Sequence, residues 1–98
     1  MAVTKKFLKT KPVCKVTFAI SAPEAAEAVL VGDFNDWDTT STPLKKLKNG
    51  TFKVVMDLDT DKSYEYKYIL DGEYVNDDEP EALIFNEFAN AENSLLAL

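Results

Sequence analysis

Histidine and arginine are both missing from this chain of 98 residues, which holds one cysteine and three glycines. Without histidine, the usual acid–base group near neutral pH is absent, and Cys14 and the serines have no imidazole partner for a catalytic triad. Without arginine, no bidentate clamp for phosphate or carboxylate is available. The three glycines are far apart and each lies in a turn sequence, so a glycine-rich phosphate-binding loop is excluded. These absences argue against an enzyme.

The single cysteine and the lack of long apolar runs exclude further classes of protein. A lone cysteine excludes an internal disulfide framework and a multi-cysteine metal site. Cys14 lies in the alternating segment 13–20, which predicts a buried, inert thiol. The first nine residues lack the apolar run of a signal peptide, and no segment approaches the roughly 20 apolar residues of a membrane-spanning helix. We therefore expect a cytoplasmic protein.

The net charge is −6, from eleven lysines and seventeen acidic residues. Nucleic-acid-binding proteins carry clustered positive charge, and anionic membranes repel acidic proteins, so we expect neither partner. Paired carboxylates can hydrolyse a glycoside, but the acidic residues here are scattered over turns, as surface charge is. The acidic run 77–81 could hold a hard cation such as calcium. Because it lacks regularly spaced ligands, a solvated acidic turn is the favoured interpretation, and we expect no metal or cofactor.

Hydrophobic residues make up 46% of the chain and charged residues 29%, which is the composition of an ordinary globular domain. The length suffices for one domain with a modest core. We interpret residues 1–12 as an N-terminal arm and residues 13–98 as a single domain.

Alternation of apolar and polar residues dominates the pattern and predicts β-strands. The alternating segments are 14–20, 52–58 and 64–70, and shorter strands are expected at 29–31, 44–47, 73–75, 83–85 and 94–98. Asn49-Gly50 predicts a hairpin with a type I′ turn, and Asp71-Gly72 predicts a second hairpin. Residues 22–28 are interpreted as a connection with one helical turn. About seven short strands separated by turns predict an all-β fold, an antiparallel β-sandwich.

Residues 32–37, which read Gly-Asp-Phe-Asn-Asp-Trp, place the only tryptophan in a polar turn after an apolar strand. Because apolar and polar residues alternate here, Phe34 is expected to be the buried anchor and Trp37 the exposed ring. Spacing alone leaves two interpretations of Trp37 open. It is either a lid over one end of the sandwich or a platform for a ligand.

A second cluster covers residues 64–74, where Lys67 lies in a tyrosine-rich strand and Tyr74 follows the Asp71-Gly72 turn. The alternation puts Lys67 on the face opposite Tyr64, Tyr66 and Tyr68. Taken alone, Lys67 is a surface lysine. Sugar recognition requires an apolar ring against the C–H face of a pyranose and polar groups at the hydroxyl rim. Trp37, Tyr74, Lys67 and nearby asparagines meet that requirement if they share a face.

Three motifs in this order resemble carbohydrate-binding module family 48. They are residues 29–37, 64–74 and 90–94, and the resemblance covers residues 13–98. That family includes the isoamylase N-terminal or early-set domains and the glycogen-binding domain of the AMP-activated protein kinase beta subunit. The lysine-rich start and residues 11–18 look like short bacterial proteins made of this domain alone. The resemblance implies an immunoglobulin-like sandwich that binds α-1,4-linked glucans such as glycogen or starch.

The resemblance also implies roles for individual residues. The first binding tryptophan of the family matches Trp37 and its lysine matches Lys67, while its second tryptophan falls on Tyr74, a smaller ring. A leucine that enters the coil of the glucan in glycogen-binding members falls near Phe88. The final contact, an asparagine, falls on Glu92, with Asn93 beside it.

Two functions from different classes follow from these residues. The first is a non-catalytic module in which Trp37 and Tyr74 stack on glucose rings of glycogen, starch or maltooligosaccharides. The alternative is an interaction domain that docks on a protein partner, such as a glycogen-metabolising enzyme, with little or no sugar binding. An exposed apolar patch around Trp37 and Phe88 fits either function.

Overall fold

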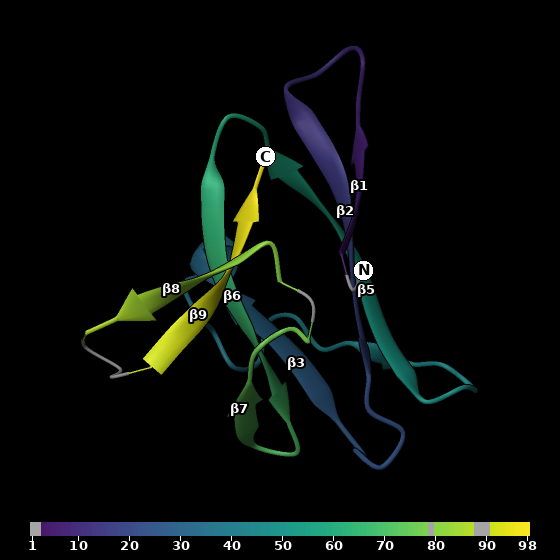
Figure 1. Cartoon of the computed structure of the whole chain (residues 1–98). Coiled ribbons are helices and arrows are strands. Elements are labelled where there is room, and N and C mark those ends of the chain that lie inside the picture. The colour runs from purple at the N-terminus through teal and green to yellow at the C-terminus, as the bar shows by residue number, and fades with distance from the viewer. Residues whose placement is uncertain (1–2, 79, 88–90) are drawn as a thin grey trace.

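The computed structural model describes residues 3–78, 80–87 and 91–98, and nearly all of its regular structure is β-strand. Two antiparallel sheets form a sandwich, as predicted (Figure 1). The first sheet has the order β1-β2-β5-β4 and the second has the order β3-β6-β9-β8, with β7 also paired to β6. The strands are β1 (Val3–Phe7), β2 (Val13–Ser21), β3 (Ala28–Gly32), β4 (Lys45–Lys46), β5 (Thr51–Asp59), β6 (Ser63–Leu70), β7 (Glu73–Val75), β8 (Ala82–Asn86) and β9 (Ala91–Ala97).

The three alternating segments of the sequence form the long strands β2, β5 and β6, each with one face in the core. Rings from both sheets fill that core. Phe18 of β2 lies 5.3 Å from Tyr66 of β6 between ring centroids, and Tyr66 lies 6.0 Å from Tyr68 in an edge-to-face arrangement. Cys14 is fully buried, as predicted. Apolar burial of this kind is the main stabilising contribution in a small sandwich.

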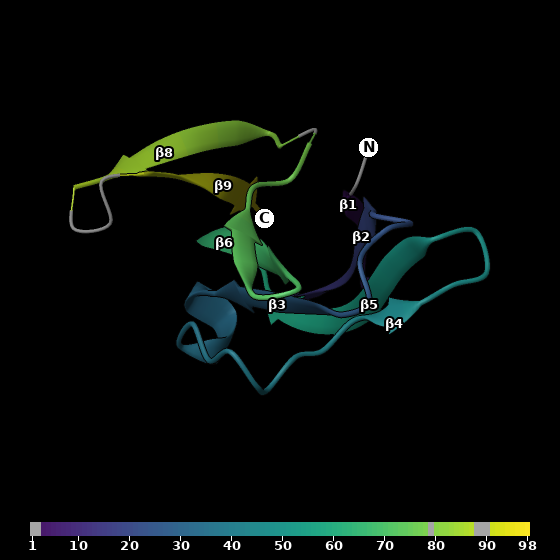
Figure 2. The same cartoon turned by 90° about the horizontal axis from the view of Figure 1, so that it is seen from below.

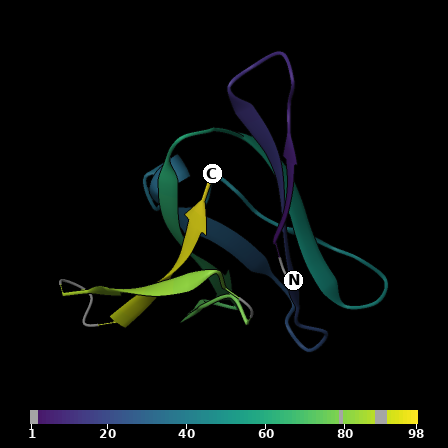
Figure 3. The same ribbon diagram turned by 45° about the horizontal axis from the view of Figure 1, so that its top comes forward.

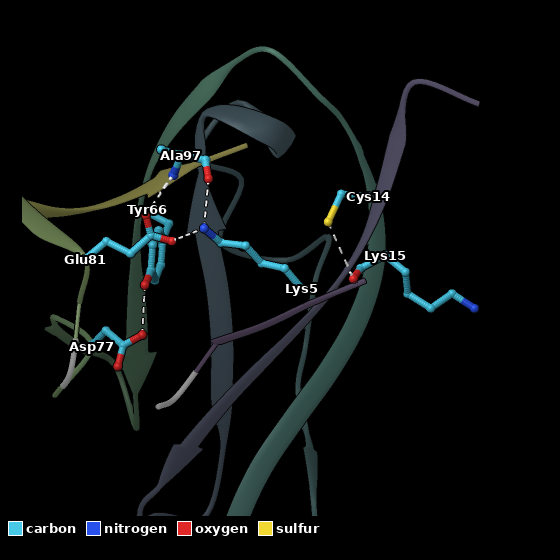
Figure 4. A network of polar contacts seen from close by, with 7 residues as sticks. All are labelled: Lys5, Cys14, Lys15, Tyr66, Asp77, Glu81 and Ala97. Carbon is cyan, nitrogen blue, oxygen red and sulfur yellow. Dashed lines mark hydrogen bonds and ion pairs between the residues drawn. The ribbon is translucent and has the colours of Figure 1, made fainter. Parts of the chain in front are cut away.

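Residues 3–7 pair with β2 as an edge strand, although the sequence alone marked them only as part of an arm. Lys5 joins this strand to the second sheet. Its ammonium group donates to the carbonyl oxygen of Ala97 at 2.9 Å and forms an ion pair with Glu81 (Figure 4). The two ends of the chain are therefore held together across the open side of the sandwich.

Two local predictions are wrong. Residues 22–28 contain a β-turn closed by the Ala25 N–H and the Ala22 carbonyl oxygen at 3.1 Å, and no helical turn. At Asn49-Gly50 only Gly50 has a positive φ, of 84°, so the turn is not type I′. Gly50 N–H instead donates to Leu47, as in a type I turn followed by a left-handed glycine. The Asp71-Gly72 hairpin is confirmed, since both residues have positive φ.

The β8–β9 hairpin extends beyond the rest of the sandwich, away from the first sheet (Figures 2 and 3). A single three-residue 3-10 turn, η1 (Asp33–Asn35), follows β3. Within the part of the chain that the structure describes, no helix has the length and apolar character needed to span a membrane. The candidate site described below lies on the surface where β8 and β9 extend away from the sandwich.

Candidate functional site

Strand β6 changes partner along one of its edges, and this change creates a groove. Residues Ser63 to Tyr66 pair with β9, whereas Tyr68 to Leu70 pair with β7. Lys67 lies at the point where β9 departs and β7 begins. Figure 1 shows β9 and β8 turning away from β6 while β7 lies along its lower end. The outer face of the second sheet is therefore concave at Lys67.

The groove has a volume of about 490 Å³ and brings together residues from several strands and one loop. Its lining side chains are Trp37, Lys67, Tyr74, Asn86, Ala91 and Asn93. Two aromatic rings, one ammonium group and two amides thus share one open surface. That combination provides apolar faces for stacking and polar groups for hydrogen bonds.

Trp37 reaches the groove through an unusual backbone conformation. Asp36 and Trp37 both have left-handed φ values, 54° and 58°, which few residues other than glycine adopt. The turn is closed by Trp37 N–H, which donates to the Gly32 carbonyl oxygen at 3.0 Å. Two consecutive left-handed residues cost about 1–3 kcal/mol each, and such strain is concentrated at functional sites. The strain therefore supports a functional position for the Trp37 ring.

Three neighbours hold the loop that carries Trp37. Phe34 is half-buried and packs against the core, 5.5 Å from Phe18 between ring centroids, so it anchors the loop but is less buried than predicted. Asn35 donates to the Leu30 carbonyl oxygen and accepts from Gly32 N–H, both at 3.0 Å. Gly32 is required because a Cβ there would lie 2.6 Å from the Glu65 carbonyl oxygen. Trp37 is also half-buried rather than exposed as predicted, and it lines the groove.

The polar groups around the rings are also held in place. Asp33 accepts from the Trp37 indole N–H at 3.1 Å and from the Glu65 backbone N–H at 2.8 Å, so it ties the loop to β6. Glu65 in turn accepts from the Asn93 side-chain amide at 3.2 Å. That bond uses the NH₂ group of Asn93, and only 3% of this residue is exposed, so its amide oxygen can meet a ligand only at the floor of the groove.

Lys67 is oriented across the gap between β6 and β9. Its ammonium group donates to the Glu92 carbonyl oxygen at 3.1 Å, and the Asn76 side-chain amide donates to the same oxygen at 2.9 Å. An ammonium group has three donors, so Lys67 keeps donors for a ligand. The groove thus offers a donor at Lys67 and an acceptor at Asn93.

The residues predicted from the sequence fall into three groups. Trp37, Lys67, Tyr74 and Asn93 all line the groove, and Tyr74 is 54% exposed. Glu92 is paired with Phe85 on the opposite face of the β8–β9 hairpin and contributes its backbone carbonyl oxygen. Phe88 lies outside the described residues.

Asn86 and Ala91 line the groove but were not predicted as site residues. They face each other across the β8–β9 pair, two residues from the Ile84–Asn93 pair, and so share the face of Asn93. The signal would have been the register of this hairpin. The sequence between β8 and β9 contains no glycine or proline that would fix such a register.

The acidic run 77–81 differs from the solvated turn that the sequence indicated. Asp77 is 4% exposed and accepts a hydrogen bond from the Tyr66 hydroxyl at 2.8 Å (Figure 4). Glu81 forms the ion pair with Lys5. Among the described residues, no group of three or more acidic, histidine or cysteine side chains could hold a metal ion. Asp77 therefore belongs to the core of the second sheet.

Comparison with known proteins gives two findings. Residues 7–89 match the model of carbohydrate-binding module 48, the isoamylase N-terminal domain. The chain is also similar to a 1,4-alpha-glucan branching enzyme of Aquifex aeolicus, at 42% identity over 58% of this chain and 9% of that protein. It is 49% identical to the 1,4-alpha-glucan-branching enzyme of Saccharomyces cerevisiae, over 43% of this chain and 6% of that protein.

A third relative is the branching enzyme of Bacillus caldolyticus, at 37% identity over 52% of this chain and 8% of that protein. The aligned region thus spans less than a tenth of the length of these relatives. The family match, by contrast, covers most of the sandwich, including β6 and the loop of Trp37. The chain therefore belongs to carbohydrate-binding module family 48, the family of the isoamylase N-terminal domain.

Proposed function

We propose that the groove binds α-1,4-linked glucans without acting on them chemically. The observation that carries the proposal is the convergence of Trp37, Tyr74, Lys67 and Asn93 on one open groove. Trp37 and Tyr74 stack on the C–H faces of glucose rings, while Lys67 and Asn93 bond their hydroxyl groups. Asn86 adds a second amide to the hydroxyl rim.

The relatives support the choice of sugar. All three are named as branching enzymes of 1,4-alpha-glucans. Of the two remaining predicted residues, Phe88 would enter the coil of the glucan, as the resemblance implies, and Glu92 would act through its backbone carbonyl oxygen, which orients Lys67.

The groove favours binding over catalysis. Among the described residues that line it, none carries a carboxylate, a hydroxyl nucleophile or a thiol, apart from the phenol of the exposed Tyr74. Glycoside hydrolysis generally requires a pair of carboxyl groups about the scissile bond. We therefore expect glycogen incubated with the protein to release no reducing ends.

Titration with maltoheptaose, followed by calorimetry and by amide NMR shifts, tests the proposal. Affinity should be modest, because a shallow groove engages few atoms and sugar hydroxyls must first lose water. Trp37→Ala should weaken binding at least about tenfold, which corresponds to roughly 1.4 kcal/mol. Tyr74→Trp should strengthen binding, since the larger ring offers more stacking area.

Phe85→Ala provides the matched control for Trp37→Ala. Phe85 is 57% exposed but lies on the hairpin face opposite Asn86, so its loss should leave sugar affinity unchanged. A cellooligosaccharide of the same length controls for the linkage. Absence of any response at millimolar maltoheptaose, or equal responses of the two variants, would contradict the proposal.

A further inference from the structure

The charges of this protein are divided between its two sheets, which the net charge of −6 conceals. Residues 3–23 and 44–59, which contain all strands of the first sheet, hold nine of the eleven lysines and two acidic residues. The remaining segments hold two lysines and fifteen acidic residues. The first-sheet segments therefore carry a formal charge of +7 and the others −13.

Four of these lysines occupy the outer face of the first sheet. Lys6 of β1 is directly opposite Lys15 of β2, and Lys45 of β4 is directly opposite Lys53 of β5. All four are exposed. We call this surface the basic face, with Thr17 and Val55 at its centre. Its two acidic residues are Asp57, opposite Lys15, and Asp59, opposite Val13 at the end of β5.

Protection of sheet edges does not account for this arrangement. Lysines on edge strands such as β1 and β4 prevent association with other strands. Lys15 of β2 and Lys53 of β5, however, lie at positions that are paired with a neighbouring strand on both sides. Like charges directly opposite each other destabilise a sheet. The face thus keeps two unfavourable pairs that edge protection does not require.

From these observations we propose that the basic face is a docking surface for an acidic protein surface. Val55 is 46% exposed at its centre and paired with Thr17, with Lys53 on one side of it along β5 and Lys15 on one side of Thr17 along β2. A partly apolar centre within a charged rim is the anatomy of a protein interface. The partner would bind on the sheet opposite the groove.

The same observations disfavour other anionic partners. All the positive charges are lysines, which lack the bidentate fork with which arginine binds phosphates. Nucleic acid is long enough to meet the −13 half of the molecule as well. The side chains on the basic face include no aromatic ring to enter a lipid interface.

Poly-L-glutamate is the probe for an acidic protein surface, with binding followed by amide NMR shifts in about 50 mM salt, where charges are weakly screened. We expect shifts at Lys15, Lys53 and Val55 and none at the Trp37 indole. Lys53→Glu should weaken binding at least several-fold. This variant should stay folded, because it turns the Lys45–Lys53 repulsion into an attraction.

Lys62→Glu is the matched control, because it makes the same change in charge at an exposed lysine of the β5–β6 turn. It should reduce binding far less than Lys53→Glu. Equal losses in the two variants, or no binding of poly-L-glutamate, would overturn the proposal. So would tighter binding to a DNA duplex or to phosphatidylserine vesicles than to poly-L-glutamate.

Discussion

Tyr66 and Tyr68 project from the same face of β6 into the core, but their hydroxyl groups have different surroundings. Tyr66 donates to Asp77 at 2.8 Å, whereas the buried Tyr68 hydroxyl has no hydrogen-bond partner among the described residues. Burial raises the pKa of both phenols far above their ordinary value, with the Asp77 hydrogen bond raising that of Tyr66 further. Both side chains therefore remain protonated in the folded protein.

Removal of the two hydroxyl groups should change stability in opposite directions. Tyr66→Phe leaves Asp77 without this donor and should lower the free energy of unfolding by about 1–3 kcal/mol. Tyr68→Phe removes a buried polar group that has no partner, so it should raise stability by up to about 1 kcal/mol. Urea unfolding measures both, and the slope against urea should stay constant.

The two variants serve as each other's control, because each removes one oxygen atom from neighbouring buried rings. If both lowered stability equally, the Tyr68 hydroxyl would have to be hydrogen-bonded, and the assignment of Asp77 as the partner of Tyr66 alone would fail. Sugar affinity should be unchanged in both, since neither ring lines the groove.

At the scale of single residues, the family resemblance indicated more of the candidate site than the local alternation of apolar and polar residues did. Trp37 in a polar turn was compatible with either a lid or a platform. In the structure Phe34 packs against the core and the half-buried Trp37 lines the groove, an arrangement that supports the platform proposed above. The left-handed conformation that turns Trp37 outward depends on contacts of Asn35 and Gly32 with distant strands, which no local pattern encodes.

At the scale of elements, the two glycine turns of the sandwich differ in their surroundings. Gly50 and Gly72 have nearly the same φ, 84° and 86°. A Cβ at Gly50 would lie 2.6 Å from the Cβ of Pro23, whereas a Cβ at Gly72 would meet nothing within 4 Å. An alanine would therefore meet the same backbone strain at both positions, but it would meet a steric conflict only at position 50.

Alanine substitutions should separate these two costs. Gly72→Ala should lower the free energy of unfolding by about 1–2 kcal/mol, the cost of the left-handed conformation alone. Gly50→Ala should lower it by a further 1–3 kcal/mol or so, because Pro23 and its turn must move. Thermal unfolding measures both values. A Gly72→Ala variant that is as unstable as Gly50→Ala would contradict this explanation.

Elements with strict alternation were predicted well, and those whose form depends on distant contacts were not. Strands β2, β5 and β6 have one buried face each, so their sequence alone indicates them. The Asn49-Gly50 turn is different, because Gly50 packs on Pro23 and its carbonyl oxygen accepts from Ala22 N–H at 3.0 Å. The Asn-Gly dipeptide favours a type I′ turn, but the turn that contacts Pro23 and Ala22 is of another type. The described residues form nine strands rather than about seven, and the strand that the sequence did not indicate is β1, which had been interpreted as part of an arm.

At the scale of the whole molecule, the sandwich separates an aromatic groove from a basic face. Every groove residue comes from the loop after β3 or from strands β6 to β9, and every lysine of the basic face comes from the first sheet. Composition could not reveal this, because a net charge sums over both sheets. The acidic overall charge argued against anionic partners, yet one sheet is strongly basic.

The separation predicts that the two surfaces bind independently. Saturation with poly-L-glutamate should change the dissociation constant for maltoheptaose less than about twofold, a coupling below roughly 0.4 kcal/mol. Maltoheptaose is neutral, so no charge interaction connects the two ligands, and the close-packed core separates the two surfaces. Calorimetric titration of the sugar with and without the polymer measures the coupling. Competition between the two ligands would instead show that the polymer binds in the groove, at Lys67. In that case Lys67→Met would abolish binding of the polymer, whereas Lys53→Glu would not.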